Sequence, residues 1–136
     1  MEEGAYAKRG IARTYALIFG IVYVAIALTE VITKDALELV LEFTGIQNAV
    51  HWAVGVVGLL SFFGSEGTAK LIARIVGVVF VALTLYGFVA PDSLGELLGF
   101  EGDIPVSYNV VHAVTAVVAL YAGFATRANY GRAATA

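Results

Sequence analysis

Four long runs of apolar residues, separated by short polar segments, dominate the chain. They cover about residues 14–32, 46–63, 71–90 and 106–126, and each is close to the roughly 20 residues that cross a bilayer as an α-helix. The first run matches a later one and no convincing cleavage site follows it, so we keep it as a helix of the mature protein. The pattern therefore predicts four membrane-spanning helices.

Two connecting segments, 33–45 and 92–105, have a different pattern in which leucine and valine alternate with acidic residues at helical spacing. Such a pattern is typical of a short amphipathic helix that lies at the membrane interface. Gly45 is expected to end the first of these helices, and Pro91 to end the span before the second. Residues 64–68 are expected to form a tight polar turn.

The two halves of the chain repeat each other. A shift of 57 residues places Gly20 on Gly77 and Asp35 on Asp92, and a shift of 61 places Asn48 on Asn109. Each repeat holds two spans, an even number, so both enter the membrane from the same side. We predict an all-α integral membrane protein: a bundle of four transmembrane helices built from two parallel two-helix repeats, about 14–63 and 71–126, forming a single membrane domain over 1–136. Short interfacial helices join spans one and two and spans three and four.

Composition strengthens the membrane assignment. The chain is 60% hydrophobic and 14% charged, against roughly 25% charged for soluble domains, and its mean hydropathy is +0.85. It contains no cysteine, which excludes a disulfide framework, a thiolate metal site and a cysteine nucleophile.

The distribution of charge predicts the orientation in the membrane. With four spans, seven of the eight basic residues fall on the side of the two termini, and Lys34 alone falls on the other side with eight of the eleven acids. Basic residues favour the cytoplasmic side. We therefore expect both termini in the cytoplasm.

The chain's two histidines occupy equivalent places near the outer ends of the even-numbered spans. His51 follows Asn48 by three residues, and His112 follows Asn109 by three, so each Asn and His share a helix face. Small residues continue the same stripe, which indicates that this face points into the bundle. We interpret the four residues as an inter-repeat polar pair, in which each Asn-x-x-His element hydrogen-bonds to its copy.

Two other interpretations of these residues stay open. Two imidazoles in a four-helix bundle can ligate a haem or a chlorin magnesium, or a transition metal if Glu30 joins them. Glu30 is also a candidate intramembrane carboxylate, although its place two residues from the span end favours a side chain that reaches the interface. Tyr23 lies in mid-span and needs a partner within the bundle for its hydroxyl.

Enzymatic and nucleic-acid functions have no sequence signal. The chain has no glycine-rich phosphate loop, no nucleophile elbow and no pair of carboxylates within a span. Its basic residues are dispersed, so it has no footprint for nucleic acid. We expect a non-enzymatic protein.

The repeated segments resemble a known family. Two Asn-x-Val-His elements, at Asn48 and Asn109, begin spans two and four, and Gly-Ile-Val-Tyr-Val at Gly20 corresponds to Gly-Val-Val-Phe-Val at Gly77. In these features the chain is similar, over about 12–126, to an uncharacterised prokaryotic family of small four-span membrane proteins, a domain of unknown function. The resemblance implies four spans in a prokaryotic inner membrane and transfers no activity.

We expect an accessory or structural subunit of a larger membrane complex, or a self-associating bundle. Its partners would be membrane lipids and other membrane proteins or copies of itself, and it would need no cofactor. The first alternative is a protein that binds haem, chlorin or metal through His51 and His112. The second is a small transporter that uses Glu30.

Overall fold

A computed structural model describes residues 10–33 and 44–125, and this part of the chain is helical throughout apart from short connections. Its five helices are α2 (Ile11–Ile32), α4 (Gly45–Phe63), α5 (Glu66–Val89), α6 (Pro91–Leu98) and α7 (Val106–Phe124). All except α6 are long and apolar enough to cross a membrane. The predicted fold class is confirmed, and the chain is a multi-pass membrane protein.

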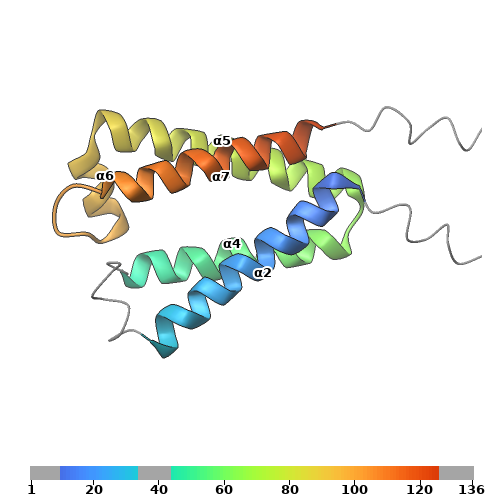
Figure 1. Cartoon of the computed structure of the whole chain (residues 1–136), viewed down its shortest axis with the longest axis horizontal. Coiled ribbons are helices and arrows are strands. Elements are labelled where there is room, and N and C mark those ends of the chain that lie inside the picture. The colour runs from blue at the N-terminus through green and yellow to red at the C-terminus, as the bar shows by residue number, and fades with distance from the viewer. Residues whose placement is uncertain (1–9, 34–43, 126–136) are drawn as a thin grey trace, which may run out of the picture.

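The four long helices form two antiparallel hairpins. Helix α2 lies beside α4, and α5 lies beside α7, as Figure 1 shows. At one end of the bundle, α6 and the loop after it connect α5 to α7. At the other end lie the start of α2, the turn between α4 and α5, and the end of α7. Each hairpin corresponds to one sequence repeat.

Helix α5 begins earlier than the sequence pattern predicts. The segment 64–68 was expected to be a turn, but Ser65 is the N-cap of α5, and its hydroxyl accepts a hydrogen bond of 3.0 Å from the backbone N–H of Thr68. A serine in this position satisfies one of the free N–H groups of the first helical turn. The helix therefore starts at Glu66 and includes a polar first turn that hydrophobicity alone does not reveal.

The connection between spans three and four contains the expected short helix. Helix α6 begins at Pro91, a residue suited to a first helical turn, and is followed by Gly99 in the left-handed conformation with φ of 85°. Leu94 is completely buried, together with Phe100 and Ile104. The helix that we predicted between spans one and two lies in 34–43, outside the described residues.

Glycines let the two helices of the first hairpin approach closely. A Cβ atom on Gly20 would lie 2.7 Å from the backbone nitrogen of Leu59, and one on Gly58 would lie 3.0 Å from the Cα of Gly20. At the equivalent place in the second hairpin, a Cβ on Gly77 would lie 3.1 Å from the nitrogen of Leu120. In a bilayer, apolar side chains gain little free energy by moving from lipid into a helix contact, because the acyl chains are equally apolar. Close backbone packing is therefore a main source of helix association.

Aromatic side chains fill the contact between the hairpins. Phe19 and Tyr23 of α2 form one buried cluster with Phe80 of α5 and Ala116 of α7. The opposite faces of the long helices expose large apolar side chains such as Phe63 and Val117, as expected for surfaces that contact lipid acyl chains.

The close contact at Gly20 generates a prediction. Gly20→Ala should lower the free energy of unfolding in detergent by about 1–3 kcal/mol, because the new methyl group overpacks against backbone atoms that belong to a second helix. Gly45→Ala is the matched control, since nothing lies within 4 Å of a Cβ at that position. Equal thermal stability of the two variants would contradict the close-packing interpretation.

Candidate functional site

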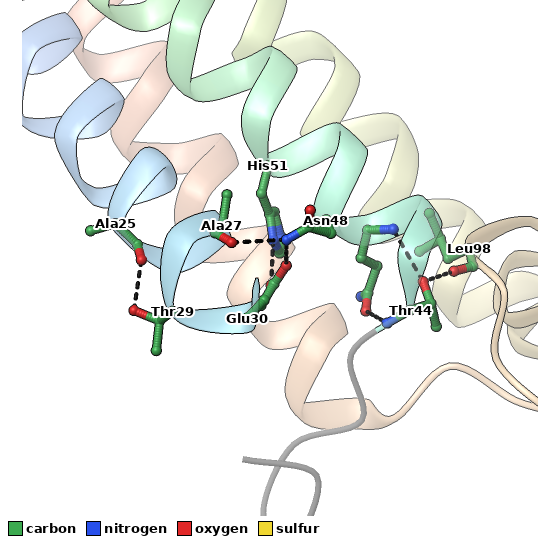
Figure 2. Close-up of polar contacts among 9 residues, drawn as sticks. Ala25, Ala27, Thr29, Glu30, Thr44, Asn48, His51 and Leu98 are labelled. Carbon is green, nitrogen blue, oxygen red and sulfur yellow. Dashed lines mark hydrogen bonds and ion pairs between the residues drawn. The ribbon is translucent and has the colours of Figure 1, made fainter. Parts of the chain in front are cut away.

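The carboxylate of Glu30 is the centre of a buried polar cluster in the first hairpin. Figure 2 shows Asn48 and His51, both from α4, directed at Glu30 near the end of α2. The His51 Nδ1–H donates a 2.7 Å hydrogen bond to Oε1, and the Asn48 amide donates a 2.6 Å bond to Oε2. Each carboxylate oxygen thus has its own donor, and we call these three residues the Glu30 cluster.

The start of α4 sets the register of this cluster. Thr44 and Gln47 form a capping box, in which each side chain binds the backbone N–H of the other residue. One turn further on, Asn48 and His51 share the face that meets α2. The amide of Asn48 also donates a 3.0 Å hydrogen bond to the carbonyl of Ala27, which joins the two helices through the backbone.

Our expectation that Glu30 reaches the membrane interface was wrong. The residue is 5% exposed. It lies on the α2 stripe that faces α4, and two hydrogen-bond donors there compensate the loss of water around the carboxylate. The candidate intramembrane carboxylate is therefore a buried one.

The hydrogen bonds that we predicted between the two Asn-x-x-His elements are not found among the described residues. Asn48 and His51 bind to α2, the other helix of their own hairpin. In the second hairpin the amide of Asn109 donates a 3.2 Å bond to the carbonyl of Thr84 in α5, and Thr84 is the repeat equivalent of Ala27. Each asparagine thus joins the helices of one repeat, not one repeat to the other.

Aromatic rings form the connection between the two histidines. The His51 ring packs edge-on against Tyr23 with 5.5 Å between ring centroids, and the His112 ring packs in the same way against Phe80 at 5.6 Å. Tyr23 and Phe80, which are repeat equivalents, meet at 6.4 Å. The Tyr23 side chain also lies close to that of Thr115 in α7.

The second hairpin has no counterpart of the buried acid. Gly87 stands at the position equivalent to Glu30, and a Cβ there would lie 2.3 Å from the side-chain oxygen of Asn109. The Oδ1 atom of Asn109 and the Nδ1 atom of His112 are both buried without a hydrogen-bond partner. The two repeats therefore share a backbone design but differ in their polar chemistry.

The site offers limited ligands for a metal or cofactor. Among residues 10–33 and 44–125, no three His, Asp or Glu side chains come together in a way that could hold a metal ion, so the set of Glu30 and both histidines is not assembled. Glu30 does orient His51 through Nδ1, as a carboxylate orients a metal-binding imidazole. A cofactor would therefore be ligated through the other ring nitrogen, Nε2.

Two further polar contacts, which we did not predict from the sequence, hold the ends of the helices. The Glu66 carboxylate accepts hydrogen bonds of 2.9 and 3.1 Å from the backbone N–H groups of Ala12 and Arg13 at the start of α2. At the opposite end of the bundle, the Thr44 hydroxyl donates to the carbonyl of Leu98 in α6. Both contacts join one repeat to the other. The capping box at Thr44 is readable as a Thr-x-x-Gln pattern, whereas the partner of Glu66 has no local signal.

Two arginines bind the C-terminal ends of α4 and α7. The Nε–H groups of Arg13 and Arg74 donate hydrogen bonds of 2.9 and 2.8 Å to the carbonyls of Phe62 and Gly123, which are equivalent positions near the ends of α4 and α7. A positive charge is favourable there because the carbonyl groups of a final turn carry partial negative charge. Each of these arginines thus binds within its own hairpin.

The fold and the polar cluster define a small four-span membrane protein with an acid–imidazole pair buried inside its first hairpin. The chain belongs to the family described as Domain of unknown function (DUF4383), which matches residues 33–125. Neither the curated proteins nor the solved structures gave a significant match.

The Glu30 cluster generates a second prediction. Glu30→Ala should lower the free energy of unfolding by about 1–3 kcal/mol, because it leaves the donors of His51 and Asn48 buried without an acceptor. Glu96→Ala, which removes an exposed acid on α6, is the control and should change stability by less than about 0.5 kcal/mol. Denaturation in mild detergent measures both, and an unchanged stability of the Glu30 variant would refute the role of the cluster.

Proposed function

We propose that this chain is a non-enzymatic structural protein of a prokaryotic inner membrane, acting as an accessory subunit of a larger complex or as a self-associating bundle. The observation that carries the proposal is the use of the polar groups in the spans. Asn48 and Asn109 donate to equivalent backbone carbonyls and join the helices of each hairpin in the same way. Polar side chains that hold helix pairs together in this way make the bundle a rigid scaffold.

The arrangement of charge supports a fixed orientation within such a complex. Arg13, Lys70 and Arg74 lie towards the end of the bundle that holds the α4–α5 turn, and α6, with Asp92 and Glu96, lies at the other end. We propose that the basic end faces the cytoplasm. The acidic end would then face outwards.

A native-size measurement tests the structural role. The protein, tagged in its own host and extracted in a mild detergent, should migrate well above the 14.3 kDa of a single chain plus its detergent, with a fixed composition. The double variant Asn48→Ala, Asn109→Ala should reduce the amount of this complex, because the hairpins lose their cross-helix bonds. Thr29→Ala, which removes an exposed bond within one helix, should leave it unchanged. Migration as a single chain, with no product after cross-linking in intact membranes, would contradict the proposal.

A second candidate function is a small proton-linked carrier. The specific observation in its favour is the buried contact between Glu30 and His51, two ionisable groups only 2.7 Å apart inside an apolar span. Such groups are rare in membrane helices and often mark ion or proton paths.

Flux through reconstituted vesicles separates this candidate from the structural role. If the protein is a carrier, vesicles containing it should acidify under an imposed proton gradient faster than empty vesicles. Glu30→Gln should abolish the difference, since the amide keeps the shape of the side chain and cannot exchange a proton as the carboxylate does. Glu96→Gln is the control and should retain the flux. Equal rates with and without the wild-type protein would exclude a proton path through Glu30 that works without a second substrate.

A further inference from the structure

The two repeats place equivalent asparagine and histidine side chains against different residues. In the first repeat, the Asn48 amide and the His51 imidazole converge on one carboxylate. In the second repeat, Asn109 and His112 stand at the equivalent places on α7, and residue 87 on α5 has no side chain. We call Gly87, Asn109 and His112 the Asn109 site.

Two atoms of the Asn109 site have unsatisfied hydrogen-bonding capacity. Asn109 is 2% exposed, and its Oδ1 atom accepts no hydrogen bond, although its amide nitrogen donates to Thr84. The Nδ1 atom of His112 is buried and also unpartnered. Buried polar atoms are nearly always paired with protein or with ordered water, so each unpaired one calls for a partner.

The direction of these atoms follows from the first repeat. Asn109 lies against Gly87, with its Oδ1 only 2.3 Å from where a Cβ atom would be. His112 is three residues further along α7, on the same helix face. Its ring contacts Phe80 as His51 contacts Tyr23, so both imidazoles have similar placements. The unpartnered atoms thus belong to one side of α7, the side that faces α5.

We propose that the Asn109 site binds one water molecule, which bridges Asn109 Oδ1 and His112 Nδ1 where the first repeat uses the carboxylate of Glu30. Oδ1 requires a donor, which a carboxylate group does not supply. Nδ1 donates or accepts according to its tautomer. Water has two O–H donors and two lone pairs, so it satisfies both atoms with either tautomer. Gly87 is then the residue that keeps a protein carboxylate out of the site.

Nuclear magnetic resonance of the full chain in lipid nanodiscs tests the proposal. The protein has two histidines, so selective ¹⁵N labelling of histidine gives two sets of ring signals that are readily assigned with single His variants. Magnetisation transfer from water to the Nδ1 side of the His112 ring is expected in the wild-type protein. A His112 Nδ1 signal without transfer from water, as for a direct bond to Asn109, would overturn the proposal.

Variants at the two equivalent positions sharpen the test. Gly87→Glu should abolish the transfer at His112 and give its Nδ1 the shift of a carboxylate-bonded nitrogen, like that of His51. Glu30→Gly makes the first repeat resemble the second and should increase the transfer at His51 Nδ1. If Gly87→Glu does not fold, Gly87→Ala serves instead, because its methyl group adds no charge. It would lie 2.3 Å from Asn109 Oδ1, so it displaces that oxygen, one of the two atoms that hold the water. Transfer at His112 that persists unchanged in a folded Gly87 variant would place the water elsewhere and refute the assignment.

Discussion

A polar group in the core of a bilayer has to find its hydrogen-bond partner within the protein, and this constraint explains how the first hairpin is arranged. Glu30 is tolerated inside an apolar helix because two donors on α4 meet its two oxygens. Those donors fix which face of α4 meets α2 and at what height along the helix. The glycines of the same face then allow the backbones to come close enough for side chains of ordinary length to bond.

The structure divides its polar contacts between two tasks. Asparagine amides and the two helix-end arginines join the helices inside each repeat. Aromatic rings and the helix-end contacts of Thr44 and Glu66 join one repeat to the other. Tyr23 and Phe80 meet in the middle of the bundle, and Thr44 and Glu66 act at opposite ends. This division explains how two similar halves form one bundle while one of them carries an acid that the other lacks.

The sequence was sufficient for the four spans and the repeat, because long apolar runs and matching segments depend on local composition. It was less informative wherever a residue depends on a distant partner. Glu30 was placed at the interface by its distance from the span end, but the neighbouring helix decided its burial. The Asn-x-x-His elements revealed a shared face without revealing which helix that face meets. The early start of α5 depends on Ser65, a capping signal that hydrophobicity does not detect.

The contact between Glu66 and the start of α2 has a consequence for assembly. The backbone N–H groups of Ala12 and Arg13 donate hydrogen bonds to the carboxylate of Glu66, which lies 54 and 53 residues later in the chain. Because a chain is synthesised from its N-terminus, α2 emerges before the residue that completes its first turn. The first turn of α2 therefore gains these two hydrogen bonds only after the chain has been made through Glu66, the first residue of α5.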